Sequence, residues 1–206
     1  MKDWSNKPVI IVASGPSLTD DDVNLVKKYL QQGKIRVIVI NDNWQLIRFA
    51  DVLYAADHRW WTTYYAKVAE FFMGESWTCD SRIADHYAGI NYIPSVVGAG
   101  LPESKSFIKV GATSTTQAIE LAYIWNARII ALLGLDCQAS SGRKHWFGNH
   151  PPALDEVLPF QRWMEELGIL AKELSAEGLT VYNCSRETAL TCFPRIALTD
   201  FLKLHT

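Results

Sequence analysis

The chain has 206 residues, enough for one domain with a full hydrophobic core and too short for two comfortable ones. Hydrophobic residues make up 49% and charged residues 20%, as in an ordinary soluble globular protein. The 20 basic and 22 acidic residues give a formal net charge of -2, which disfavours nucleic acid as the main ligand.

The cysteines and the first residues indicate the compartment. Cys79, Cys137, Cys184 and Cys192 form no CxxC pair and have no metal-ligand spacing. The opening residues, MKDWSNK, lack the apolar core of a signal peptide, and no window approaches the roughly 18 apolar residues of a membrane span. We therefore expect a cytoplasmic protein with free thiols and no membrane span.

Short apolar runs with strand character recur along the chain and alternate with helical patterns. This alternation predicts an α/β fold: a single Rossmann-like domain over residues 1–206, with a mainly parallel sheet flanked by helices on both faces. The predicted strands are Val9–Ala13, Arg36–Ile40, Val52–Ala55, Ile90–Pro94, Arg128–Leu133 and Thr180–Tyr182.

Three helices have recognisable starts or ends. The first begins after Thr19, where three aspartates complement the helix dipole, and is expected to end near Gln32 before a glycine. The second begins at the hydroxyl residues that follow Gly111. The third is expected to cover 158–176.

The segment from Asp57 to Met73 is dense in aromatic side chains. Such density is more typical of a core or packing face than of a platform that stacks on a base or sugar. We expect packing, and stacking stays open as the alternative.

Polar residues follow five of the predicted strands. In a parallel sheet the carboxyl ends of the strands meet at one edge, so these residues are expected to line a ligand crevice. They are Ser14, Gly15, Pro16 and Ser17; Asn41 and Asp42; Asp57 and His58; Asp136; and Asn183 and Ser185.

Two turns in this crevice are candidates for binding an anion. The Ser14–Ser17 turn offers backbone amides and hydroxyls, but the aspartates at 20–22 would repel a polyphosphate unless the phosphates lie toward Ser14 or a divalent cation intervenes. The turn at Thr113 and Ser114 has hydroxyls and a helix start without nearby acids. It is the better anion site, with plain helix capping as the alternative.

A polar segment at about 136–153 is expected to form a mobile loop beside the crevice. It carries Arg143 and Lys144, which could meet phosphate charge, and His145 and His150. Histidine suits a general base because its ordinary pKa lies near neutrality, whereas a solvated loop histidine is the simpler interpretation. Together with Asp136, these two histidines are the predicted catalytic residues.

Several common motifs are absent. The sequence has no Walker A motif, no G-x-G-x-x-G and no G-x-S-x-G, so P-loop, dinucleotide-binding and α/β-hydrolase functions are disfavoured.

Four short motifs, in order, together resemble one superfamily. VIIVASGPSL resembles the first strand and turn of bacterial CMP-sialic-acid-dependent sialyltransferases, motility-accessory flagellin glycosyltransferases and archaeal hydroxymethylpterin diphosphokinases. GATSTTQAIELAYIWNARIIALLGLDC resembles their central helix start, strand and G-x-D turn, and YNCSRETAL their closing strand. SGRKHWFG is similar to the Gly-Lys-x-His loop of the latter two groups.

The resemblance implies a Rossmann-like transferase. It implies that the Ser14–Ser17 turn, Asn41 and Thr113-Ser114 contact the nucleotide, and that a loop histidine assists transfer. Paired tyrosines follow the G-x-D turn in the sialyltransferases, whereas this sequence has Cys137 and Gln138 there. Small stand-alone members of the group occur in phage genomes, so a phage origin is one expectation.

Three functions stay open on these grounds. The favoured one is a glycosyltransferase with a nucleotide-sugar donor, CMP-linked by resemblance, a small-molecule or glycan acceptor and no obligatory metal. The second is an ATP-dependent diphosphokinase of the hydroxymethylpterin type, which would recruit Mg²⁺ through Asp42, Asp57 or Asp136. The third is a non-catalytic nucleotide-binding protein. A homo-oligomer also stays open.

Overall fold

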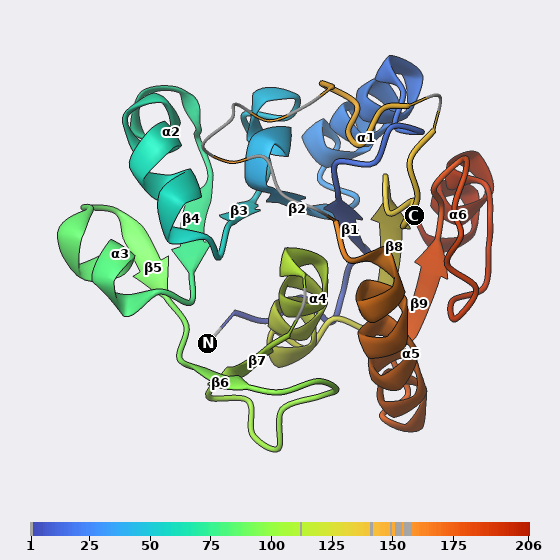
Figure 1. Ribbon diagram of the computed structural model, residues 1–206. Coiled ribbons are helices and arrows are strands. Elements are labelled where there is room, and N and C mark those ends of the chain that lie inside the picture. Colours follow the sequence, from blue (N-terminus) through green and yellow to red (C-terminus); the bar gives the residue numbers. More distant parts are fainter. Residues whose placement is uncertain (1, 112, 141, 149, 151–153, 155–157) are drawn as a thin grey trace.

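The computed structural model describes residues 2–111, 113–140, 142–148, 150, 154 and 158–206. Its centre is a seven-stranded, all-parallel sheet in the order β5-β4-β3-β2-β1-β8-β9 (Figure 1). This confirms the predicted α/β fold with a parallel sheet. The strands are β1 (Val9–Val12), β2 (Arg36–Ile40), β3 (Val52–Tyr54), β4 (Glu75–Thr78), β5 (Ile90–Tyr92), β8 (Ile129–Leu133) and β9 (Thr180–Asn183).

Helices connect the strands, and a separate two-stranded parallel ladder pairs β6 (Ser95–Val97) with β7 (Ile108–Val110). The helices are α1 (Asp20–Gln31), the 3-10 helix η1 (Asn41–Gln45), α2 (His58–Phe71), α3 (Ser81–His86), α4 (Ser114–Ile124), α5 (Phe160–Ala176) and α6 (Leu198–His205).

Alternate residues of the central strands pack into two separate cores. Val9 and Ile11 face a core that includes α4 and α5, while Ile10 and Val12 face a core that includes α1, α2, α3 and α6. A strand that is buried on both faces reads as a continuous apolar run, which is why β1, β2 and β8 are recognisable in the sequence. Helices therefore cover both faces of the sheet, as predicted.

Three strands are missing from the sequence prediction. β4 begins with an exposed glutamate and alternates buried with less buried residues, while β6 and β7 are only three residues long. None of them contains an apolar run that stands out from its surroundings. Their strand geometry depends on main-chain pairing with neighbours, which a local pattern does not contain.

The helix starts agree with their sequence signals. Thr19 and Asp22 form a reciprocal capping box at the start of α1. Gly33, which has a left-handed backbone with φ 67°, follows the end of this helix. Thr113 caps α4 by accepting from the Thr115 amide. α5 begins at Phe160, two residues later than predicted.

The aromatic segment forms α2 and packs mainly into the core. Trp60 and Trp61 are buried, which confirms the packing interpretation for them, whereas Phe71 is 41% exposed. Within the described part of the chain, no helix combines the length and apolar character that crossing a membrane requires.

β1 lies between β2 and β8, so the chain leaves β1 in one direction and returns on its other side. Val12 is in register with both Val39 and Leu133, and the three strands therefore end at the same level. Ligands of open α/β sheets bind at such a reversal of strand order, outside the carboxyl ends.

Candidate functional site

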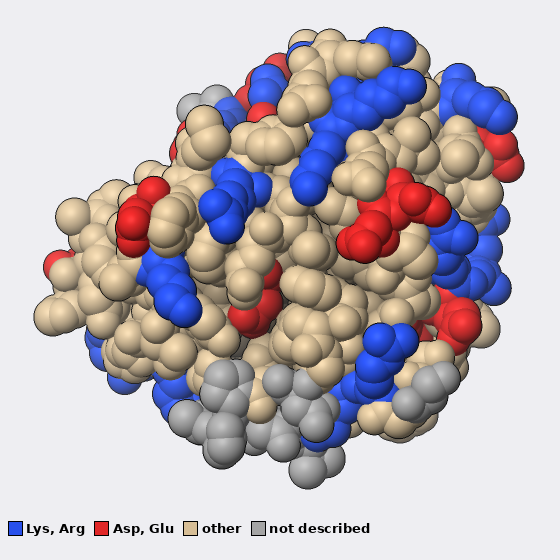
Figure 2. Space-filling view, turned by 90° about the horizontal axis from the view of Figure 1, so that it is seen from above, with Lys and Arg blue, Asp and Glu red and all other residues tan. Residues whose placement is uncertain are grey.

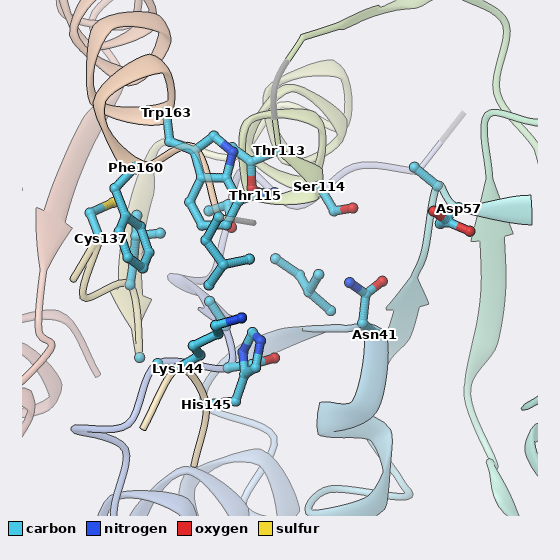
Figure 3. A pocket seen from close by; sticks show the side chains of 18 of the residues that line it. Asn41, Asp57, Thr113, Ser114, Thr115, Cys137, Lys144, His145, Phe160 and Trp163 are labelled. Carbon is cyan, nitrogen blue, oxygen red and sulfur yellow. Dashed lines mark hydrogen bonds between the residues drawn. The ribbon is translucent and has the colours of Figure 1, made fainter. Parts of the chain in front are cut away.

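A pocket of about 380 Å³ lies at this reversal point (Figure 3). The ends of β1, β2, β3, β7 and β8, the start of α4 and the loop before α5 all contribute to its wall. Of the predicted site residues, it is lined by Ser14, Gly15, Asn41, Asp57, Thr113, Ser114, Asp136, Lys144, His145 and His150.

Seven predicted site residues are not part of this wall. Ser17 and Asp42 lie behind it in buried positions, and Asn183 and Ser185 are buried beside the end of β8. The seven are Pro16, Ser17, Asp42, His58, Arg143, Asn183 and Ser185. The structure therefore does not bring together every polar group that follows a strand.

Asn183 and Ser185 have structural hydrogen bonds instead. Ser185 Oγ accepts from the Leu135 amide at 2.8 Å, and Asn183 Oδ1 accepts from the Ser185 amide at 3.0 Å. Asn183 Nδ2 donates to Thr188 Oγ1 at 3.2 Å. These contacts hold the end of β9 against the turn after β8, and they occupy the groups that sequence reasoning assigned to a nucleotide.

The Ser14–Ser17 turn is fastened to the turn after β8. The Gly15 amide donates to the Gly134 carbonyl at 2.7 Å, and both the amide and the hydroxyl of Ser17 donate to the Asp136 carboxylate at 2.7 Å. A Cβ on Gly15 would lie 2.4 Å from Asp136 Cγ and 2.5 Å from Gly134 O. Only glycine allows the two turns to approach this closely.

Asp136 is therefore a structural acceptor at the pocket wall. Burial raises the pKa of this carboxyl, and the two hydrogen bonds from Ser17 oppose the rise. Both carboxylate oxygens accept a hydrogen bond from Ser17, which gives Asp136 a structural role, and its catalytic role stays a prediction.

Asn43 is an organising residue that the sequence prediction missed. Its side chain is fully buried, and its Nδ2 donates to the carbonyls of Val12 and Ile40 at 3.0 and 2.8 Å. Its Oδ1 accepts from Trp146 Nε1 at 2.7 Å, which ties the histidine loop to the ends of β1 and β2. The available signal was a third polar residue directly after a buried strand.

Asn41 and Asp57 form the polar end of the pocket, on the right in Figure 3. Asn41 has a left-handed backbone, with φ 49°, and its buried Oδ1 has no hydrogen-bond partner among the described residues. Asp57 Oδ1 accepts from the Trp60 amide at 3.0 Å and so caps α2. An unpaired buried acceptor is costly, which makes Asn41 a suitable partner for a ligand donor.

Phe160, Trp163 and Cys137 form the opposite, apolar end of the pocket (Figure 3). The two rings pack edge to face, with centroids 5.4 Å apart. Burial raises the pKa of Cys137 to about 12, so its thiol stays protonated at neutral pH and is a poor nucleophile. This end offers an apolar, aromatic surface to a planar group.

The start of α4 faces the histidine loop across the middle of the pocket. Thr113, Ser114 and Thr115 line one side, with Lys144 and His145 opposite (Figure 3). The first turn of α4 contains no acidic residue. Helix dipole, hydroxyls and a lysine thus converge on one region, which favours an anionic group there.

His145, Phe147 and His150 form an aromatic cluster within the loop. The His145 ring stacks on Phe147 with centroids 4.9 Å apart, and the His145 and His150 rings are 4.7 Å apart. The loop prediction at about 136–153 includes residues 141, 149 and 151–153, which lie outside the described residues. Its mobility stays a prediction.

No cluster of three or more His, Cys, Asp or Glu side chains suited to a metal ion occurs among the described residues. Of the three aspartates considered for Mg²⁺, Asp57 caps a helix, Asp136 accepts from Ser17 and Asp42 lies behind the wall. All four cysteines are free thiols.

On the face seen from above, Lys and Arg side chains lie in separate groups, with acidic as well as uncharged side chains between them (Figure 2). Such a distribution on this face does not resemble a nucleic-acid binding stripe.

Comparison with known proteins yields no matching family model, no matching curated protein and no matching solved structure. The resemblance to the sialyltransferase and diphosphokinase group therefore depends on the four sequence motifs alone.

Proposed function

We propose that the chain is a nucleotide-sugar-dependent glycosyltransferase with a CMP-linked donor. The observation that carries this proposal is the placement of the α4 start opposite Lys144 and the two loop histidines in one pocket. The first group suits a phosphate and the second suits proton transfer, so one pocket contains candidate groups for both requirements of glycosyl transfer.

The proposed reaction is a displacement at the anomeric carbon of the donor. An acceptor hydroxyl attacks that carbon, the bond to the phosphate oxygen breaks, and the nucleoside monophosphate leaves with the electron pair. A loop histidine takes the hydroxyl proton, while Thr113, Ser114 and Lys144 stabilise the charge that develops on the phosphate.

The two ends of the pocket suggest how the donor is oriented. The aromatic end at Phe160 and Trp163 suits a planar base, and Asn41 and Asp57 suit the hydroxyl groups of a sugar. The pocket volume of about 380 Å³ lies within the range of small-molecule sites.

The alternative transferase is an ATP-dependent diphosphokinase, in which the terminal diphosphate passes to a hydroxymethyl oxygen with Mg²⁺. Of the three candidate aspartates, Asp42 does not line the pocket, and Asp136 lines it but accepts hydrogen bonds from Ser17. Asp57 lines the pocket and is not the acceptor for Ser17. A non-catalytic nucleotide-binding protein is the remaining alternative.

Calorimetric titration with CMP, CTP and ATP, with and without Mg²⁺, separates these functions. The glycosyltransferase proposal predicts CMP binding without metal. ATP binding that requires Mg²⁺ would favour the diphosphokinase, and the absence of any nucleotide binding would overturn both enzyme functions. CMP binding without turnover of any CMP-sugar would favour the non-catalytic protein.

A further inference from the structure

Asp42 is a buried carboxylate directly behind the pocket wall. Its side chain is 4% exposed and follows β2 in the 3-10 helix η1. Its Oδ2 accepts from Trp60 Nε1 at 3.0 Å, and its Oδ1 accepts from Gln45 Nε2 at 3.3 Å. Both donors are neutral, so these contacts hold the carboxylate in place without cancelling its charge.

His150 presents one ring nitrogen to this carboxylate. Its Nδ1 lies 3.8 Å from Asp42 Oδ2, and the same ring lines the pocket that Asp42 does not reach. Nδ1 is buried and has no hydrogen-bond partner among the described residues. A buried polar nitrogen without a partner is costly, and a contraction of about 1 Å would pair it with Asp42.

Such a long contact is common in a site without its substrate. Catalytic hydrogen bonds are often long in unliganded enzymes and shorten when the substrate binds. His150 belongs to the loop that Trp146 attaches to Asn43, and Asn43 and Asp42 belong to the same 3-10 helix η1, so this hydrogen bond holds the loop near the Asp42 carboxylate.

We propose that Asp42 is the positioning residue for His150 and that His150, rather than His145, is the general base. The inference rests on the proposed transferase function. Pairing with Asp42 keeps the proton of the neutral ring on Nδ1, which leaves the lone pair of Nε2 to accept the acceptor's hydroxyl proton. The Asp42 carboxylate then stabilises the imidazolium, and no further group is needed to balance the step.

The other groups around this pair are compatible with that role. Burial and the charge of Asp42 raise the pKa of Tyr64, so the tyrosine stays a neutral hydroxyl. His145 packs edge to face against His150 and supports its ring, and Lys144 and Arg59 line the same pocket.

Nitrogen-15 NMR of histidine-labelled protein tests the pairing without any need for turnover. The chain has five histidines, and His150→Gln identifies the relevant signal. At about pH 8.5, where histidine is neutral, we expect the parent His150 to carry its proton on Nδ1. Asp42→Asn removes the negative charge that favours a proton on Nδ1, and it should therefore shift this proton toward the Nε2–H tautomer.

A second pair provides the matched control. His58 Nδ1 lies 3.2 Å from Asp80 Oδ2 on the surface, and neither of these two residues lines the pocket. Asp80→Asn should change the His58 signal and leave His150 unchanged, and Asp42→Asn should do the reverse. An unchanged His150 tautomer in Asp42→Asn would overturn the proposal.

Kinetics with CMP-sialic acid as the probe, measured as CMP release, give the second readout. Asp42→Asn should lower kcat by roughly 10²- to 10⁴-fold with KM within about twofold, because the base acts in the transition state. Parent-like kcat would overturn the positioning role. If Mn²⁺ broadens the His150 signal in the parent and not in Asp42→Asn, Asp42 is a metal ligand and the proposal is wrong.

Failure of the pairing proposal can be distinguished from failure of the transferase proposal. If the parent binds no nucleotide but Asp42 still sets the His150 tautomer, the transferase proposal fails and the pairing stands. If turnover is present and Asp42 has no influence on His150, the transferase proposal stands and the pairing fails.

Discussion

Two turns at the carboxyl edge of the sheet look alike in sequence and differ in the structure. The turn between β1 and α1 and the turn between β7 and α4 both place serine or threonine before a helix. In the first, Ser17 donates twice to Asp136, and three aspartates follow in the first turn of α1. In the second, Thr113 and Ser114 line the pocket and no acid follows.

The difference shows that a hydroxyl in a turn indicates a ligand site only when the fold leaves it facing a cavity. α1 satisfies its own start through the Thr19 and Asp22 capping box, and Asp22 is also paired with Arg186. At the start of α4, fewer local contacts of this kind satisfy the helix amides and the helix dipole. We therefore expect substitutions in the first turn to change stability, and substitutions in the second turn to change ligand binding.

The largest expected effect concerns a buried acid within α4. Glu120 is 1% exposed, and burial raises its pKa from 4.5 to about 8. Since its folded pKa exceeds its unfolded one, the free energy of unfolding should fall as pH rises from about 4.5 to about 8. The loss attributable to this group is on the order of 4–5 kcal/mol.

Glu120→Gln removes this loss and keeps an acceptor for the Lys109 amide. The variant should therefore be more stable than the parent at pH 8, and the difference should shrink toward pH 5. Urea unfolding across that range measures it, with exposed Glu70→Gln as the control. Parallel curves for parent and Glu120→Gln would contradict the expectation.

The second effect compares the glycines of the two turns. Gly15→Ala should cost about 2 kcal/mol or more, because its Cβ would meet Asp136 and a backbone carbonyl. Gly111→Ala should cost less than about 1 kcal/mol, since the nearest atom is the end of the flexible Glu166 side chain. The midpoints of urea unfolding measure the loss of stability in each variant. Equal losses would show that the first turn is no more tightly packed than the second.

The third effect is on binding. Thr113→Val combined with Ser114→Ala should weaken CMP binding by about tenfold, or ~1.4 kcal/mol, because two hydroxyls at the helix start are lost. Ser17→Ala should leave the affinity within about twofold, since Ser17 faces Asp136 behind the wall. Calorimetry measures both. Unchanged affinity in the double variant would reduce that turn to helix capping.

The smallest effect is at the start of α1. Arg186 Nε and Nη2 donate to Asp22 at 2.8 and 3.0 Å, but about half of the Arg186 side chain is exposed. Arg186→Gln should therefore lower the free energy of unfolding by only about 0.5–1 kcal/mol, with a smaller difference in high salt. Urea unfolding at two salt concentrations tests this, and Arg82→Gln, from an exposed local pair, is the control. A salt-independent loss would indicate packing instead of charge.

Much of the fold was predictable because its signals are local. β1, β2 and β8 are apolar runs that are buried on both faces, and Thr19 and Thr113 are capping residues next to the helices they start. Such features depend on neighbours within a few residues. The parallel sheet then follows from the alternation of strands with helices.

The candidate site was predictable in part. The sequence alone indicated the edge of the sheet, the α4 start and the loop with His145 and His150, all of which line the pocket. It did not indicate that Phe160 and Trp163, at the start of a helix far along the chain, close the opposite end. Nor did it indicate Asn43 as the residue that holds the loop.

The sequence by itself determined the fold class and the helix starts, because propensity, periodicity and capping act over short stretches of chain. Only the tertiary structure decided which polar groups are already engaged and which face a cavity. Ser17 meets Asp136 across 119 positions and Trp146 meets Asn43 across 103. Hydrogen-bond partners that distant are brought together by strand order and packing, and no local pattern contains them.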